Sequence, residues 1–173
     1  MIAGDRRFRK GTAADVPAIR ALLESAYRGD SARQGWTHES DLLSGDRTSE
    51  AEVAGIVAAP HQRIIVVEER ARVIGCVAIT DLGSGKAYLG MLAVSPALQA
   101  GGLGRALIAA AEDEARRTFA ARSMEMTVIG LRPELIAWYQ RRGYQPTGEI
   151  RPFHYDAPER AGIALVVLER QIA

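Results

Sequence analysis

The sequence predicts a layered fold of the α/β (α+β) class, built around one mixed, largely antiparallel sheet. Apolar residues recur with helical spacing in some segments and form short β-branched runs in others, in the order strand, helix, helix, three strands, helix, strand, helix, two strands. The three central strands are separated only by short turns, which disfavours a doubly wound parallel sheet. At 173 residues, we expect residues 1–173 to form a single domain.

The first third of the chain predicts a short strand around Phe8 and two helices. Thr12, with Asp15 three residues later, matches a capping box at the start of the first helix. The second helix is expected to be capped near Thr48 and to stop before Pro60. The apolar side of the first helix consists of Val16, Ile19, Leu22, Leu23 and either Tyr27 or Ala26.

Three strands then follow without a helix between them. RIIVVEER and VIGCVAIT are separated by a turn at Arg70 and Ala71, which predicts a hairpin. DLGSGK predicts the next turn, and AYLGMLAV predicts the third strand. Cys76 lies inside an apolar strand, so we interpret it as a small buried residue and not as a nucleophile.

Helices and strands alternate in the last part of the chain. A helix beginning near Leu103 is expected to bury its small apolar residues and to expose a polar face that contains Glu112. SMEMTVI predicts a strand, and PELIAWYQRR predicts a helix that starts at Pro133 and is capped by Gly143. YQPTGEI and GIALVVLER are the last two strands.

Composition limits the classes of partner. A formal net charge of +1, with no basic run, gives no support for nucleic acid as a partner. No apolar run approaches the ~20 residues of a membrane span and the first residues lack a signal peptide, so no membrane partner is expected. The one cysteine cannot form an intramolecular disulfide, which fits a cytoplasmic protein. No metal site is predicted.

Gly101, Gly102 and Gly104 stand where the central helix begins, although glycine costs about 1 kcal/mol relative to alanine inside a helix. A helix N-terminus without side chains exposes backbone N–H groups and a partial positive charge, and both suit a phosphate. Arg105 adds charge in the first turn. The glycines alone fit a phosphate-binding loop and a simple connecting turn equally well.

Two nucleotide-binding patterns fit these glycines poorly. A P-loop needs lysine and serine or threonine after its last glycine, but Arg105 and Ala106 follow Gly104. The dinucleotide pattern needs a third glycine where Leu107 stands, and it needs a parallel βαβ unit where hairpins are predicted. An oxidoreductase of the Rossmann type is therefore disfavoured.

Two blocks resemble motifs of the GNAT (Gcn5-related) N-acetyltransferase superfamily. Gln99–Gly104 reads Q-x-x-G-x-G, like the family's acetyl-CoA pyrophosphate loop, and LIAWYQRRGY is similar to its downstream Y-x-x-x-G-[FY] helix. The two blocks lie in the family's order, and the order of elements agrees over nearly the full length. The resemblance implies a GNAT-like central sheet of about six to seven strands flanked by about four helices.

The resemblance implies acetyl-CoA as co-substrate. In the family the strand before the loop bulges and splays from the next strand, and the pantetheine arm pairs with its backbone, here at Leu92, Ala93 and Val94. By this alignment the Leu92 N–H faces the thioester carbonyl and would stabilise an oxyanion. The residues that would hold the pyrophosphate, mainly through backbone N–H groups, are Gln99, Ala100, Gly101, Gly102, Leu103, Gly104 and Arg105.

The resemblance also assigns the general acid. Tyr139 matches the family tyrosine beside the CoA sulfur, and a phenol can protonate the departing thiolate; the alternative is an aromatic anchor in the core. We assign no general base, because Glu39, Glu68, Glu69 and His154 are each weak candidates.

Residues 29–45 align with the family loop that forms one wall of the acceptor pocket. Trp36, Thr37 and Glu39 are the predicted substrate-binding residues, because an aromatic face beside a carboxylate suits an amine; Trp36 could equally anchor the loop to the core.

The predicted function is acetyl transfer from acetyl-CoA to a primary amine of a small molecule or peptide, directly within a ternary complex. The alternative is a non-catalytic acyl-CoA-binding sensor or regulatory domain. A homodimer is common in the family and is possible here.

Overall fold

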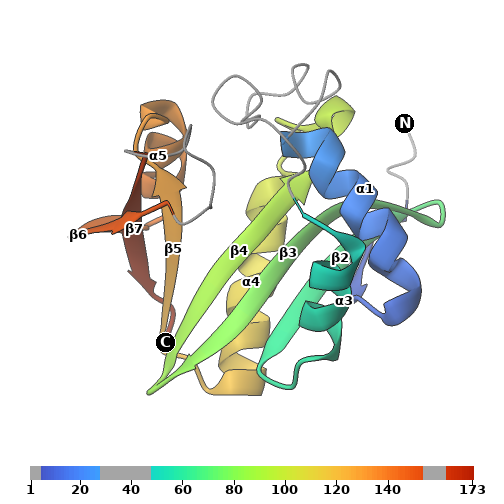
Figure 1. The fold of residues 1–173 in the computed structure, drawn as a ribbon, viewed down its shortest axis with the longest axis horizontal. Helices are drawn as coiled ribbons and strands as arrows, with labels where there is room; N and C mark the ends of the chain where they lie inside the picture. The colour runs from blue at the N-terminus through green and yellow to red at the C-terminus, as the bar shows by residue number, and fades with distance from the viewer. Residues whose placement is uncertain (1–4, 28–47, 154–162) are drawn as a thin grey trace.

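The computed structural model describes residues 5–27, 48–153 and 163–173. These residues form one seven-stranded mixed sheet with the strand order β1-β2-β3-β4-β5-β7-β6, accompanied by four α-helices (Figure 1), which confirms the predicted class. The strands are β1 (Arg7–Lys10), β2 (Gln62–Glu69), β3 (Arg72–Gly83), β4 (Lys86–Val94), β5 (Ser123–Ile129), β6 (Gln145–Pro152) and β7 (Ala164–Gln171). The helices are α1 (Val16–Tyr27), α3 (Glu50–Ala58), α4 (Leu103–Phe119) and α5 (Pro133–Gln140), with short 3₁₀ helices at Ala13–Asp15 and Pro96–Leu98.

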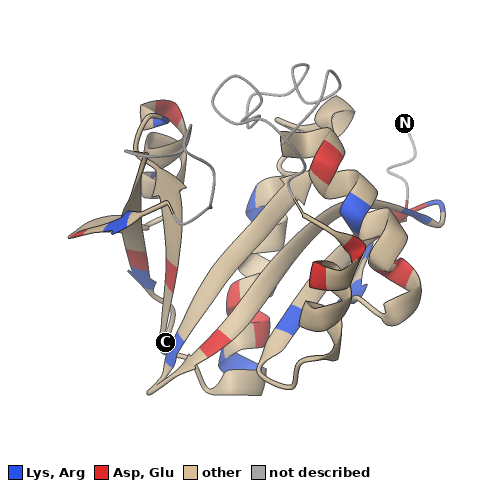
Figure 2. Ribbon diagram, viewed as in Figure 1, with Lys and Arg blue, Asp and Glu red and all other residues tan. Residues whose placement is uncertain are grey.

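Helices cover both faces of the sheet, because its central strands are apolar on both faces. Successive strand residues point to opposite faces, so Ile64 and Val66 pack on the side of α1 and α3, while Ile65 and Val67 pack on the side of α4. This double burial explains why β2 reads as a continuous apolar run. Figure 2 shows that the charged residues of β2, β3 and β4 lie toward the strand ends and leave the middle uncharged.

Gly75 of β3 lies in a tightly packed contact between the sheet and α4. A Cβ at Gly75 would lie 2.8 Å from Val67 Cγ1 and 2.9 Å from Leu107 Cδ1. Gly75→Ala is therefore expected to lower the free energy of unfolding by about 1–3 kcal/mol, because an added methyl group would overpack the core. Gly55→Ala is the matched control: nothing lies within 4 Å of its Cβ, and alanine is favoured by about 1 kcal/mol inside a helix such as α3. In denaturant unfolding, Gly75→Ala should lower the free energy of unfolding and Gly55→Ala should raise it. Equal changes in the two variants would contradict the close packing at Gly75.

The parallel strands β4 and β5 separate along their length. Their register covers Lys86–Tyr88 on β4 and Ser123–Glu125 on β5, although β4 continues to Val94 and β5 to Ile129. Figure 1 shows the two strands diverging beyond this short contact. On the other edge of β5 the sheet continues by antiparallel pairing. Strand β7 pairs with β5, and β6 pairs with β7 at the edge of the sheet.

A bulge interrupts β4 on its other edge. The register with β3 passes from Ala78 opposite Gly90 to Cys76 opposite Ala93, so Met91 and Leu92 occupy the space of one residue. Met91 has a φ of 49°, which is in the left-handed region. A bulge of this kind bends the strand and changes the direction of its backbone groups.

The environment of Glu112 differs from the sequence prediction. Instead of lying on the exposed face of α4, Glu112 is only 6% exposed. Tyr144 Oη donates to its Oε1 at 2.8 Å, and Arg170 Nη1 donates to Oε1 and Oε2 at 2.9 and 3.1 Å. A carboxylate can be buried when such donors replace its hydration. Helical periodicity could not identify these two partners, which come from other elements.

The ends of three elements can be compared with the sequence predictions. Ser49, next to Thr48, caps α3 and fits the expected cap near Thr48: its Oγ accepts the Glu52 N–H at 3.1 Å. Strand β3 extends through the first half of DLGSGK, so the turn is reduced to Ser84 and Gly85, both with positive φ. Thr12 and Asp15 form the predicted capping box.

Cys76 is 1% exposed, and its Sγ lies 3.5 Å from the carbonyl oxygen of Met91, which confirms it as a buried residue. Within residues 5–27, 48–153 and 163–173, no helix is long and apolar enough to cross a bilayer. That residues 1–173 form one domain stays a prediction.

Candidate functional site

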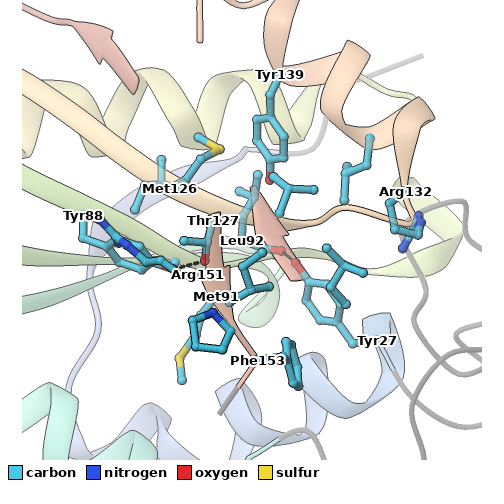
Figure 3. A pocket seen from close by; sticks show the side chains of 17 residues that line it. Tyr27, Tyr88, Met91, Leu92, Met126, Thr127, Arg132, Tyr139, Arg151 and Phe153 are labelled. Carbon is cyan, nitrogen blue, oxygen red and sulfur yellow. Dashed lines mark hydrogen bonds between the residues drawn. The ribbon is translucent and has the colours of Figure 1, made fainter. Parts of the chain in front are cut away.

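Two cavities of about 550 Å³ each meet where β4 and β5 separate. The first, the loop cavity, lies beside the start of α4 and is lined by Gln99, Ala100, Gly102, Gly104, Arg105 and Trp138, among others. The second, the sheet cavity (Figure 3), is lined by Tyr88, Thr127, Arg132, Arg151 and Phe153, among others. Both cavities are also lined by Tyr27, Leu92, Leu135 and Tyr139. These four shared residues form the junction between them.

The glycines before α4 have separate roles. Gly102 is the N-cap of α4 with a φ of 81°, a conformation that side chains disfavour, and nothing lies within 4 Å of a Cβ built there. A Cβ at Gly104 would be in ordinary contact with the Trp138 ring of α5, at 3.4 Å. Gly102 is therefore the glycine of this pattern that leaves the most open space for a ligand.

The glycine loop is attached to β4 by a side chain. Gln99 Nε2 donates to the carbonyl oxygen of Val94 at 3.2 Å, which orients the chain between strand and helix. Ala100 has a φ of 69°, so it and Gly102 form a turn with two left-handed residues. Turns of this type point backbone N–H groups toward one side and make anion-binding concavities.

The predicted cofactor-binding residues lie together around this cavity. Those that line it are Leu92, Val94, Gln99, Ala100, Gly102, Gly104 and Arg105. Ala93 and Leu103 are each 3% exposed and pack in the core, so only their backbones could take part. A Cβ at Gly101 would lie 3.3 Å from the carbonyl oxygen of Leu98, which leaves little room for a side chain there.

Three arginines make one end of the loop cavity basic. Arg105, Arg141 and Arg142 line it, together with one acidic residue, Glu134, and the Arg142 guanidinium lies 3.4 Å from the centroid of the Trp138 ring. Burial lowers the pKa of Arg142, and the positive charges of Arg141 and Arg105 lower it further. A cluster of like charges is a favourable environment for an anion. The sequence analysis did not assign Arg141 and Arg142, although both lie inside the WYQRRGY block.

Tyr139 lies on α5 at the junction and is 8% exposed. Its ring makes edge-to-face contacts with Trp138 and Tyr144, at centroid distances of 5.0 and 6.3 Å. Tyr144 is fully buried; burial, together with its neighbour Glu112, raises the pKa of its phenol far above the usual value. Tyr144 is thus a fixed neutral support, and Figure 3 shows Tyr139 pointing into the sheet cavity.

Tyr27 is a junction residue that the sequence analysis placed only as an alternative member of an apolar stripe. Ala26 is the buried residue at that end of α1, and Tyr27 instead reaches the bulge, where its hydroxyl donates to the carbonyl oxygen of Leu92. Its position at the end of α1, far from Leu92 in sequence, explains why no local pattern indicated this contact.

Polar side chains surround the rest of the sheet cavity. Tyr88 Oη and Thr127 Oγ1 are hydrogen-bonded at 2.7 Å where the strands separate. Arg151 of β6 donates to Glu149 at 2.7 Å and to Glu125 at 2.9 Å, and these bonds raise the pKa of its guanidinium above the usual value. Arg132 precedes α5 and is 7% exposed.

Some candidates from the sequence lie elsewhere. Glu68 and Glu69 form ion pairs with Arg9 and Arg6, at 2.8 and 3.0 Å, and line neither cavity. A base role for these two glutamates therefore has no support in the geometry. Trp36, Thr37, Glu39 and His154 lie outside the described residues. In the part of the chain that is described, no group of three His, Cys, Asp or Glu side chains could hold a metal ion.

The comparison with protein families matches the part of the chain that lines the loop cavity and most of the part that lines the sheet cavity. The model of the acetyltransferase (GNAT) family matches residues 17–144. The chain belongs to the GNAT acetyltransferase family. GNAT acetyltransferases use acetyl-CoA as acyl donor, and the match includes the glycine loop and Tyr139.

Solved structures of GNAT proteins share the fold at low sequence identity. A GNAT-family protein from Desulfovibrio desulfuricans is 22% identical, with a TM-score of 0.72 over 97% of this chain and 99% of that one. YncA from Salmonella typhimurium, solved with its cofactor acetyl-CoA, is 19% identical, with a TM-score of 0.72 over 98% and 95%. The ribosomal-protein-S18-alanine N-acetyltransferase from Escherichia coli is 17% identical, with a TM-score of 0.72 over 97% and 94%. No curated protein sequence matches this chain significantly.

Proposed function

We propose that this GNAT protein transfers the acetyl group of acetyl-CoA to a primary amine, directly within a ternary complex. The observation that carries this proposal is the junction, where Tyr27, Leu92, Leu135 and Tyr139 line both cavities. A thioester in the loop cavity and an amine in the sheet cavity would meet there without a covalent acyl-enzyme. Cys76 is buried in the core and lines neither cavity, which also favours direct transfer.

In this proposal the loop cavity binds acetyl-CoA. Backbone N–H groups of residues 99–105 would hold the pyrophosphate at the N-terminus of α4, and Arg105 would add charge. The pantetheine arm would lie along Leu92, Ala93 and Val94, where β4 has separated from β5 and its backbone can pair with an extended ligand. The basic end formed by Arg141 and Arg142 would favour the remaining phosphate groups.

The chemical step forms a C–N bond and breaks the C–S bond. The neutral amine attacks the thioester carbonyl, and the Leu92 N–H would stabilise the oxyanion of the tetrahedral intermediate. As the C–S bond breaks, Tyr139 would donate its proton to the thiolate, because a thiol has a pKa of about 8.5 and is a better leaving group when protonated. The attacking nitrogen loses one proton to solvent, and the Tyr139 phenolate regains one from solvent, so that the enzyme returns to its starting state. We assign no base, since the described lining of the sheet cavity includes neither carboxylate nor imidazole.

The acceptor would be a small-molecule or peptide amine. Trp36, Thr37 and Glu39 remain proposed contributors to its binding, and a homodimer remains possible.

Calorimetry with acetyl-CoA, combined with a thiol-release assay over a panel of amines, tests the proposed function. We expect acetyl-CoA to bind and at least one amine to release CoA at a rate above hydrolysis. Binding of acetyl-CoA without release of thiol by any amine would favour a non-catalytic acyl-CoA sensor. Binding of NADH in place of acetyl-CoA would overturn the proposal.

A further inference from the structure

We propose that the acceptor amine is the N-terminal amine of a peptide, and that the backbone of β5 at Thr127 and Ile129 binds the residue that follows it. The inference rests on the proposed function and names the substrate class of the same site. Every residue of β4 from Tyr88 to Leu92 and every residue of β5 from Met126 to Ile129 lines the sheet cavity. Successive side chains of a strand point to opposite faces, so a cavity that meets each residue in turn faces the edge of the strand, where its backbone N–H and C=O groups lie.

Two backbone hydrogen bonds show which groups of β5 point toward β4. Gly130, directly after β5, donates its N–H to the carbonyl oxygen of Ala164 in β7 at 2.9 Å, and the register between β5 and β7 runs without a shift. Alternate residues of an antiparallel strand bond its partner, so the even-numbered residues of β5 bond β7. Ser123 N–H donates at 3.2 Å to the carbonyl oxygen of Gly85, just before β4, which agrees with this alternation. The odd-numbered residues of β5 therefore direct their backbone groups toward β4.

Beyond the short contact with β4, three of these backbone groups have no partner in the described part of the chain. The register between the two strands ends at Tyr88 opposite Glu125. The carbonyl oxygen of Ile129 accepts from the Arg132 N–H at 3.0 Å. The groups left over are the Thr127 N–H, the Thr127 C=O and the Ile129 N–H. Unpaired backbone groups away from bulk water are costly, so these three mark a place for a ligand that supplies both a donor and an acceptor.

An extended peptide supplies this combination. When a strand is added to the edge of a sheet, its N–H groups donate to carbonyls of the edge, and its carbonyls accept from N–H groups of the edge. The second residue of the peptide would donate its N–H to the Thr127 C=O. Its carbonyl would accept from the N–H of Thr127 or Ile129, according to the direction of the peptide. The edge thus matches the peptide group that adjoins an N-terminal residue.

This edge lies level with the reaction centre of the proposed function. Counted from the last pair of the register, and with one residue taken up by the bulge, Leu92 of β4 is level with Val128 of β5. Figure 3 shows Thr127 and Leu92 near the middle of the cavity into which Tyr139 points. The N-terminal residue would therefore lie beside Leu92, whose N–H is proposed to face the thioester carbonyl. The products are an N-acetyl peptide and CoA, with the same bonds formed and broken as in the proposed function.

Backbone pairing, and not charge, separates this class from other amines. The aromatic lining of the cavity and the proposed residues Trp36 and Glu39 suit the ammonium group of any acceptor. Only an acceptor with an amide next to its amine also pairs with the edge of β5. A site that hydrogen-bonds a substrate N–H strongly rejects an analogue that lacks it, because the groups of the site are then left unpaired.

Changes at one atom of a small peptide test this inference with the full chain. The acceptors are alanyl-alanine amide, the same peptide methylated at its first peptide nitrogen, and the ester in which oxygen replaces that N–H. All three keep an α-amine with a pKa of about 8, so similar fractions are neutral. With acetyl-CoA saturating, we expect kcat/KM to be at least tenfold lower for the two altered compounds, because each lacks the donor to the Thr127 C=O. Propylamine and spermidine, compared at equal concentrations of neutral amine, should also be at least tenfold poorer than the peptide.

A variant of the edge assigns the preference to β5. Ile129→Pro removes an N–H that points toward β4 and leaves the bonds to β7 in place. It should lower the ratio of kcat/KM for the peptide to kcat/KM for propylamine at least tenfold. Lys10→Pro, in the edge strand β1, is the matched control and should leave this ratio unchanged. Gly11 N–H donates to Ile64, so by the same alternation the Lys10 N–H points out of the sheet, and Lys10 lines neither cavity. If Ile129→Pro does not fold, the altered peptides still decide the question on the unchanged protein.

The outcomes separate this inference from the proposed function. Failure to bind acetyl-CoA would overturn the proposed function itself. Equal turnover of the peptide and its methylated or ester form, or a preference for propylamine or spermidine, would overturn the inference and leave acetyl transfer standing. A peptide preference that survives unchanged in folded Ile129→Pro would overturn the assignment to the edge of β5.

Discussion

Tyr139→Phe is expected to lower kcat for acetyl transfer by roughly 100-fold or more, since general acid catalysis contributes about 10²–10⁴-fold. The phenyl ring would keep the edge-to-face contacts with Trp138 and Tyr144, at 5.0 and 6.3 Å, so the geometry of α5 should be retained. The affinity for acetyl-CoA should change by no more than about threefold, because the hydroxyl would act on the departing thiolate. Steady-state kinetics and calorimetry measure the two effects separately.

Tyr144→Phe is the matched control for this variant. It removes a hydroxyl from a neighbouring buried tyrosine, whose Oη donates to Glu112 at 2.8 Å away from the cavities. Loss of that bond should lower the free energy of unfolding by about 1–3 kcal/mol, because the buried carboxylate loses a donor. It should leave kcat nearly unchanged. If Tyr139→Phe retained full kcat, or if both variants lost kcat equally, Tyr139 would be a structural aromatic and not the acid.

Gly102→Leu is expected to weaken acetyl-CoA binding at least tenfold, which corresponds to about 1.4 kcal/mol of binding free energy. Nothing lies within 4 Å of a Cβ at this position, so the new side chain would project into the space where the loop is proposed to hold the pyrophosphate. Calorimetry gives the dissociation constant directly.

Backbone strain must be separated from this steric effect, because Gly102 has a φ of 81°. Gly83→Leu provides the separation: Gly83 has a φ of 79°, also has nothing within 4 Å of its Cβ, and ends β3 away from both cavities. Both variants should lose similar stability, of the order of 1–2 kcal/mol for a left-handed residue with a side chain. Only Gly102→Leu should lose affinity for acetyl-CoA. If Gly102→Leu and Gly83→Leu bound acetyl-CoA equally well, the pyrophosphate site at Gly102 would be contradicted.

The order of the elements could be read from the sequence because local periodicity encodes it. Alternating and continuous apolar runs identified the strands, and the helical stripe from Val16 to Leu23 identified α1. The glycine loop and the WYQRRGY block identified the family, since both are contiguous in sequence. The error in the turn after β3 was small, because element ends are the least sharply encoded part of a local pattern.

What local patterns cannot encode is which distant residues meet. The sequence by itself determined the fold class, the family and the positions of the glycine loop and Tyr139. Only the tertiary structure decided that Tyr27 reaches Leu92, that Glu112 is buried, and that Arg132 and Arg151 line one cavity. Each of these features depends on contacts between elements far apart in the chain, and such contacts arise from packing and not from periodicity.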